Sequence, residues 1–101
     1  MKKEEPIIIY TDEKNYRMHQ LKTVEPYFAA VVRGDKTFEV RKFDRDYQIG
    51  DFLDLVHYNP ETNQLGKRVT RRITYMLTDQ PYVPEGYVIL GMVDDVIAIP
   101  F

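Results

Sequence analysis

The chain has 101 residues, of which 44% are hydrophobic and 13% aromatic, so it is long enough for one hydrophobic core and too short for two. Its formal net charge of −2 argues against a protein that coats nucleic acid through bulk charge, so nucleic-acid binding would require a local basic patch. The absence of cysteine excludes disulfides, thiolate metal sites and a cysteine nucleophile, and favours a reducing compartment, the cytoplasm.

The first 18 residues combine charged side chains with one β-prone run, Ile7 to Tyr10. We interpret residues 1–18 as an N-terminal extension of a single domain. The apolar run is far shorter than the roughly 7 to 15 apolar residues of a signal peptide, so we expect neither export nor a membrane-spanning segment.

A helix is predicted after a short strand at residues 19–22. Thr23 is a suitable N-cap residue, Glu25 adds an early acid, and Pro26 fits the first turn because its missing N–H costs little there. Gly34 stands where a left-handed residue ends a helix. An apolar stripe at helical spacing lies between these signals and consists of Val24, Tyr27, Phe28, Val31 and Val32.

The segment from Lys36 to Arg41 is predicted to be a strand with one apolar and one polar face. Phe38 and Val40 share the first face. The second face carries a hydroxyl, a carboxylate and a guanidinium, from Thr37, Glu39 and Arg41. These groups can form the polar floor of a pocket. Periodicity alone favours equally an ordinary half-buried strand whose polar face is solvated.

Three further strands are predicted at residues 52–58, 65–77 and 87–92, separated by turn-forming residues. The first is expected to bury its leucine face and the last to be a buried closing strand. The middle one is the most basic stretch, with Lys67, Arg68, Arg71 and Arg72. Its expected core-facing residues are Val69, Ile73 and Tyr75, and Arg71 interrupts this pattern as at a β-bulge.

Residues 93–101 form a β-prone tail that either pairs with Ile7 to Tyr10 or makes an edge between subunits. One helix and several short strands in a chain of this size predict an α+β domain built on a small mixed or antiparallel β-barrel.

A series of ordered motifs spans residues 19–92. They are His19-x-Leu21-Lys22, Tyr27-Phe28, Lys36-Thr37-Phe38-Glu39-Val40-Arg41-Lys42, Asp44-Arg45-Asp46-Tyr47, Gly50-Asp51, Arg71-x-Ile73-Thr74-Tyr75 and Gly86-Tyr87-Val88. This series resembles the ASCH family (activating signal cointegrator homology) of PUA-like domains, in particular a small bacterial and phage branch. The resemblance implies a PUA-like β-barrel with one main helix near the N-terminus, a cleft lined by the strand from Lys36 to Arg41, and binding of RNA or a nucleotide.

The first functional hypothesis is therefore RNA or nucleotide binding in this cleft. Lys36, Arg41 and Arg45 are the predicted phosphate partners, and Thr37 and Glu39 complete the polar floor. Stacking surfaces are expected from Phe43, Tyr47 or Tyr58. Arg71 and its basic neighbours would extend the charge along an adjacent strand, although cations on a strand also serve to protect a sheet edge, the interpretation we favour for Lys67 and Arg68.

The second hypothesis is an enzyme. Some ASCH proteins are amidohydrolases that act on 4-acetylcytidine with a lysine, a threonine and a glutamate. Lys36 matches the lysine, Glu39 stands at the threonine position, and no residue clearly matches the glutamate. In this interpretation Glu39 takes a proton from water and Lys36 stabilises an oxyanion. The alternative is an ion pair, Lys36 with Glu39 or Glu39 with Arg41, that only shapes the cleft.

A third hypothesis is a non-catalytic interaction module that docks a partner or forms a homodimer through the apolar segments 7–10 and 96–101. No metal or cofactor is expected, because His19 and His57 are the only histidines and no spacing adds acidic ligands to them. His19 is predicted to be a structural histidine rather than a cleft wall. The acidic segment of Asp44, Asp46 and Asp51 lacks the pattern of a calcium-binding loop.

Overall fold

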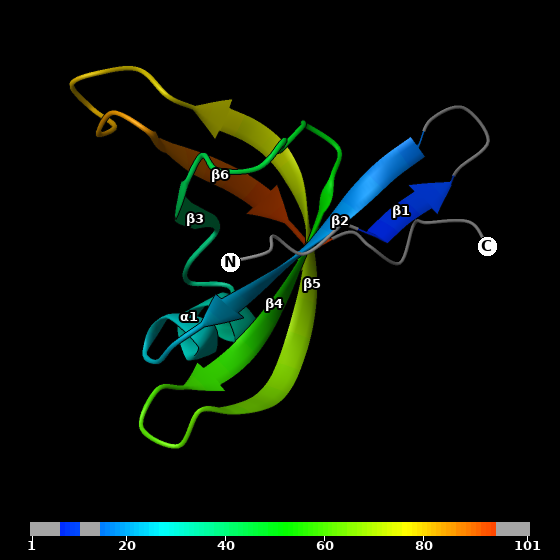
Figure 1. Cartoon of the computed structure of the whole chain (residues 1–101), viewed down its shortest axis with the longest axis vertical. Helices are drawn as coiled ribbons and strands as arrows, with labels where there is room; N and C mark the ends of the chain where they lie inside the picture. The colour runs from blue at the N-terminus through cyan, green and yellow to red at the C-terminus, as the bar shows by residue number, and fades with distance from the viewer. Residues whose placement is uncertain (1–6, 11–14, 95–101) are drawn as a thin grey trace.

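The computed structural model describes residues 7–10 and 15–94, which form one six-stranded mixed sheet with a single short helix (Figure 1). The strands are β1 (Ile7–Tyr10), β2 (Asn15–Thr23), β3 (Phe38–Lys42), β4 (Phe52–Asn59), β5 (Gln64–Leu77) and β6 (Tyr87–Val93), and the helix is α1 (Tyr27–Arg33). This arrangement confirms the predicted α+β class. The strand order is β1-β2-β4-β5-β6-β3, so β1 and β3 are the two edges of the described sheet.

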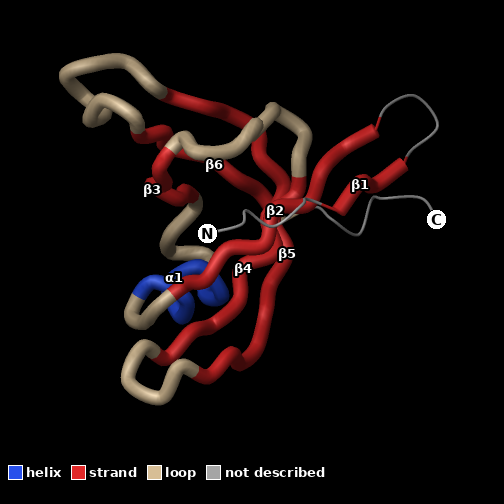
Figure 2. Tube along the Cα trace, in the orientation of Figure 1, coloured by secondary structure: helices blue, strands red, loops and turns tan. Residues whose placement is uncertain are grey.

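The long strand β5 joins two halves of the sheet. Its first part pairs with β4 and its last part with β6, and both pairings are antiparallel. β2 runs parallel to β4, and α1 provides the connection from β2 towards β3, beside the sheet (Figure 2). The two halves therefore bend around β5 and place the end of β2, α1 and β3 on the same side of the molecule.

The helix starts later than predicted. Thr23 is the last residue of β2 and is buried, so its prediction as the N-cap residue is wrong. The N-cap residue is Pro26, which provides no side-chain hydrogen bond, and the side chain of the preceding Glu25 accepts one from the backbone N–H of Ala29 at 2.8 Å. Gly34 ends the helix in the predicted left-handed conformation, with φ of 85°.

Only part of the predicted helical stripe faces the core. Phe28 and Val31 are buried, and the Phe28 ring packs edge to face against His57 of β4 at 5.3 Å. Tyr27 and Val32 are exposed, because the sheet covers only one narrow side of this short helix.

The core lies between the curved sheet and α1. Its fully buried side chains include Leu53, Leu55, Ile73, Val88 and Leu90. In β4, the residues from Phe52 to Val56 are buried on both faces, more than the predicted leucine face alone, because β4 lies between two strands and under α1.

Two predictions for β5 are wrong. The pairing with β6 is irregular between Ile73 and Tyr75, not at Arg71. An extra residue in a strand reverses the side-chain alternation that follows, so Ile73 is buried as predicted while Tyr75 is 63% exposed.

The segment from Ile7 to Tyr10 forms β1 and pairs antiparallel with residues 15–18 of β2. The tail of residues 93–101 was predicted to pair with this segment or to form an edge between subunits. Val93 is the last residue of β6, and residues 95–101 lie outside the described residues. Among the described residues no helix is long and apolar enough to cross a membrane.

Candidate functional site

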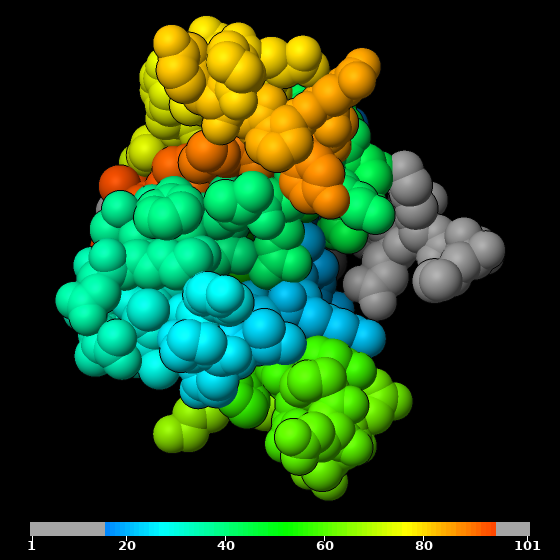
Figure 3. Space-filling model, turned by 90° about the vertical axis from the view of Figure 1, so that its left-hand side faces the viewer, coloured from blue at the N-terminus to red at the C-terminus, as the bar shows by residue number. Residues whose placement is uncertain are grey.

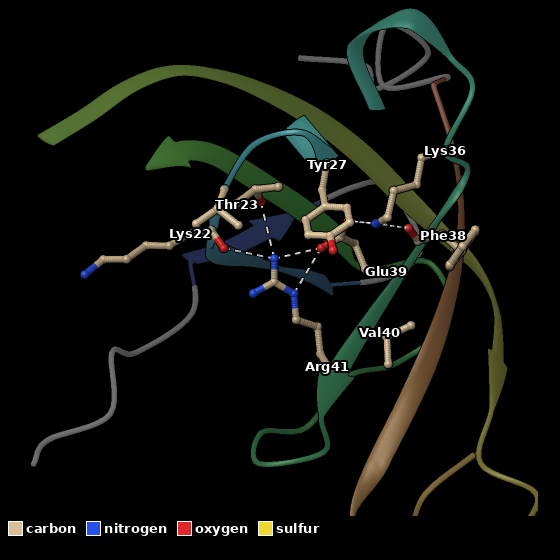
Figure 4. Close-up of a pocket in the computed structure, with 9 residues that line it drawn as sticks. Lys22, Thr23, Tyr27, Lys36, Phe38, Glu39, Val40 and Arg41 are labelled. Atoms are coloured by element: carbon tan, nitrogen blue, oxygen red, sulfur yellow. Dashed lines mark hydrogen bonds and ion pairs between the residues drawn. The ribbon is translucent and has the colours of Figure 1, made fainter. Parts of the chain in front are cut away.

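A hollow of about 440 Å³ lies where the end of β2, the start of α1 and the strand β3 come together. Figure 3 shows this face, with α1 and β3 next to one another. The lining residues, most of them labelled in Figure 4, are Lys22, Thr23, Val24, Tyr27, Lys36, Phe38, Glu39, Val40 and Arg41. The hollow therefore contains the three predicted central residues, Lys36, Glu39 and Arg41.

Glu39 is the centre of the hydrogen-bond network in this hollow. Its side chain is only 3% exposed, and both carboxylate oxygens accept hydrogen bonds from cations. Lys36 Nζ donates to Oε2 at 2.5 Å, while Arg41 donates to Oε1 from Nη2 at 2.7 Å and from Nε at 3.0 Å. Both ion pairs considered from the sequence are thus present. The alternative of a solvated polar face is wrong for Glu39.

Arg41 also connects β3 to the other side of the hollow. Its Nη2 donates to the backbone oxygen of Lys22 at 3.0 Å and lies 3.3 Å from Thr23 Oγ1. β1 covers only residues 15–18 of β2, so among the described residues a side chain of β3, and not a further strand, meets the edge of β2 at this point. This contact positions the guanidinium group between two strands that are far apart in the sheet order.

Apolar surface lies beside these charges. Phe38 and Val40 of β3 are 43% and 49% exposed, and Tyr27 of α1 is exposed as well. Lys36 Nζ is 5.0 Å from the centre of the Phe38 ring and 5.8 Å from that of Tyr27, and it also donates to the backbone oxygen of Phe38. The predicted alternation of β3 is therefore present, but its apolar face is turned outwards. A buried carboxylate is tolerated on the inner face because two cations bind it.

The other predicted site residues lie outside this hollow. Arg45 lines a neighbouring hollow that Arg41 also lines. Thr37 is exposed and lines a third hollow together with Arg71, near the end of α1. Arg71 is 13% exposed and donates to the backbone oxygens of Val31 and Thr70, so it holds α1 against β5.

The structure also contradicts the role predicted for Tyr47. It is 1% exposed and belongs to the hydrophobic core, so its prediction as a stacking surface is wrong. Burial raises the pKa of its hydroxyl group.

The basic stretch of β5 extends the site less than expected. Arg68 of this stretch forms a two-point ion pair with Asp54, and this ion pair raises the pKa of Arg68.

His19 is buried beside the core, which fits a structural histidine, but its buried Nδ1 has no hydrogen-bond partner among the described residues. Its Nε2 is 2.8 Å from Oδ2 of Asp51, and its ring lies 4.8 Å from that of Tyr47. Asp51 also accepts hydrogen bonds from the backbone N–H groups of Arg17 and Gln48. The described part of the chain contains no cluster of three or more acidic or histidine side chains that could hold a metal ion.

Sequence reasoning did not assign Lys22, Thr23 and Tyr27 to the site. They come from β2 and α1, and only the three-dimensional arrangement brings them to β3. No local pattern predicts this proximity. The motifs around Leu21-Lys22 and Tyr27-Phe28 were the one signal that pointed to these positions.

Residues 18–92 match the sequence model of a family described as a domain of unknown function, DUF3850. The chain belongs to the DUF3850 family. It is also 38% identical over 74 residues to a protein of Escherichia phage P2 called "Uncharacterized 12.9 kDa protein in GpA 3'region". That match covers 73% of this chain and 66% of the phage protein, so the chain spans about two thirds of its relative. The DUF3850 segment includes every residue that lines the hollow.

Proposed function

We propose that this DUF3850 domain binds RNA or a nucleotide, with a phosphate group at Lys36 and Arg41 and a base against the neighbouring apolar side chains. The observation that carries the proposal is the buried carboxylate of Glu39, which fixes both cations at one hollow. Cations held in place by a buried partner lose little conformational freedom when a ligand binds.

Both cations retain capacity for a ligand. Lys36 Nζ carries three protons, and the two acceptors found for it are Glu39 and the backbone oxygen of Phe38. The hydrogen bonds of Arg41 within the described residues start from Nε and Nη2, which leaves Nη1 for a further acceptor. With two cations and one carboxylate, the centre of the site has a formal charge of +1 in a chain of net charge −2. An anionic ligand is therefore favoured here.

The rest of the hollow suits a base. The exposed rings of Tyr27 and Phe38 provide surfaces for stacking, and Val40 adds apolar area. A volume of about 440 Å³ lies within the range of sites for small molecules, roughly 300 to 1,000 Å³.

The same geometry supports the proposed relation to PUA-like ASCH domains. The described sheet has open edges, but Arg41 links β3 to the uncovered edge of β2. We propose that the fold is a small barrel with a gap between β2 and β3, and that this gap is the cleft that the ASCH resemblance implies.

Calorimetric titration with AMP and with a single-stranded adenylate pentanucleotide at low salt tests the function. We expect Lys36→Gln to weaken both interactions about tenfold, because a charged hydrogen bond is lost while the glutamine amide can still donate to Glu39. Binding of the pentanucleotide should also weaken as salt increases, with a smaller slope in Arg41→Ala.

Arg33→Gln is the matched control for this experiment. Arg33 pairs with Asp35, both side chains are exposed, and neither lines the hollow. The Arg33→Gln variant should bind AMP and the pentanucleotide with the same affinity as the unchanged protein. Absence of binding at low salt, or equal weakening in the control, would contradict the proposal.

A second candidate function is hydrolysis of an acylated nucleoside such as 4-acetylcytidine. The observation in its favour is the short contact between Lys36 Nζ and Glu39 Oε2, which pairs an acid with a base at the hollow. Three hydrogen bonds already reach the carboxylate, so it has one lone-pair direction left for a water molecule. Release of cytidine and acetate that is lost in Lys36→Gln would support this function, and release that persists in that variant would exclude it.

A further inference from the structure

A second hollow adjoins the proposed nucleotide site. Its volume is about 290 Å³, and it shares Lys22 and Arg41 with the first hollow. Arg45 and Leu65 lie on its rim, and the buried Val56 contributes to its floor. The two hollows are therefore neighbours, separated by the contact that Arg41 makes with the backbone of Lys22.

The course of β2 explains why the hollows adjoin. Within the described residues, β1 pairs with residues 15–18 of β2, and residues 19–23 have a strand neighbour only on the β4 side. β3 approaches this uncovered edge through Arg41 without forming a backbone ladder. The hollows are thus two parts of one gap, on either side of a single bridging side chain.

The charge along this gap continues from one hollow to the other. The cations directed to the second hollow are Arg41 and Arg45, since the Lys22 ammonium group lies 4.8 Å from the centre of the Tyr58 ring. No acidic residue lines this hollow, and Glu39 is the one acidic residue among those lining the first. Arg45 has a distant carboxylate neighbour, Asp44, at 3.7 Å, and its side chain remains 30% exposed. Leu65 is 59% exposed and adds an apolar surface at the rim.

We propose that the gap binds two consecutive nucleotides of single-stranded RNA, with the connecting phosphate at Arg41 and the second nucleotide in the hollow of Arg45 and Leu65. A mononucleotide uses only the first hollow and leaves Arg45 without its ligand. This inference rests on the proposed nucleotide-binding function and adds the length and the path of the ligand.

The test compares AMP with the dinucleotide pApA, which carries one additional nucleotide, by calorimetry at the same low salt concentration. We expect pApA to bind at least tenfold more tightly than AMP. In Arg45→Gln this ratio should fall below threefold, because the second hollow loses its own cation. Leu65→Glu is a second variant, at a position that is 59% exposed, and its new carboxylate should reduce the ratio as well.

Arg33→Gln is again the control and should keep the ratio of the unchanged protein, and thermal unfolding checks that each variant is folded. Equal affinities for pApA and AMP, or a ratio that neither Arg45→Gln nor Leu65→Glu lowers, would overturn the two-nucleotide site and leave the proposed function standing. Failure of both AMP and pApA to bind would overturn the two proposals together.

Discussion

At the scale of single residues, the site depends on Glu39. A carboxylate with 3% exposure is stable in this environment because Lys36 precedes it by three positions and Arg41 follows it by two. Arg41 contributes in two ways, since the same guanidinium group neutralises Glu39 and binds the edge of β2. Structure and proposed function therefore share one side chain, and variants at Arg41 need a measurement of stability beside every measurement of binding.

Arg41→Ala is expected to lower the free energy of unfolding by about 2 to 3 kcal/mol, because it leaves part of a buried carboxylate without a partner. Urea unfolding followed by circular dichroism measures this loss. Arg33→Ala removes an exposed ion pair and should change the stability by less than about 0.5 kcal/mol. Equal stabilities of the two variants would show that Glu39 does not depend on Arg41.

Tyr47 gives a prediction for alkaline pH. Burial raises the pKa of its hydroxyl group in the folded protein above the usual value of about 10. The contribution of the neutral tyrosine to stability is therefore complete below about pH 10 and is lost as the pH rises through the higher folded-state pKa. Tyr47→Phe cannot ionise, so its stability should fall less between about pH 8 and 11.

Urea unfolding at these two pH values measures that difference. Tyr82→Phe is the matched control, because Tyr82 is exposed and its hydroxyl group is in contact with water in both states. The control should show the same pH dependence as the unchanged protein. If the free energy of unfolding of Tyr47→Phe fell as much as that of the control, burial would not be the cause of the raised pKa.

At the scale of elements, two glycine turns fix where the strands begin. Gly34 ends α1 before β3 and Gly50 precedes β4, with φ values of 85° and 97°. They differ in their surroundings. A Cβ atom at Gly34 would meet no atom within 4 Å, whereas one at Gly50 would lie 2.5 Å from Cε1 of the Tyr16 ring, which packs against Phe52.

Alanine substitutions separate these two effects. Gly34→Ala should lower the free energy of unfolding by about 1 kcal/mol, since only the left-handed backbone conformation is disfavoured. Gly50→Ala should cost roughly 2 to 4 kcal/mol, because the Tyr16 ring must also move away from Phe52. Denaturant unfolding of both variants measures the costs, and equal losses would show that Tyr16 adapts freely.

The same elements show how far sequence reasoning reaches. The sequence located the helix end at Gly34, because a left-handed glycine there is a local feature of the chain. It also predicted the alternation of side chains along β3, because a period of two residues is visible within the strand itself. It could not show which face of β3 is inside, since the burial of Glu39 requires cations that fold around it. Tyr75 was assigned to the wrong face for a similar reason, because the irregularity before it depends on the pairing with β6.

At the scale of the whole molecule, the open sheet order and the proposed site have a common origin. β1 covers only the first part of β2, and the bend around β5 brings β3 to the part that no other described strand covers. The sequence predicted the α+β class and the grouping of Lys36, Glu39 and Arg41 at one site, but Lys36 was wrongly placed on the strand, since β3 begins at Phe38. It could not predict Lys22 and Tyr27 as their neighbours, because that contact depends on the curvature of the complete sheet.

This arrangement predicts a preference for single strands over duplexes. The cations lie in a gap that one arginine side chain spans, and the chain as a whole is acidic, so only a strand with separated bases can place a phosphate and a base there together. A single-stranded RNA 12-mer should bind at least about tenfold more tightly than the duplex of the same sequence. Fluorescence anisotropy at equal salt measures both affinities. Since a duplex has the higher charge density, equal or tighter duplex binding would show that general electrostatic attraction, and not the gap, accounts for the interaction.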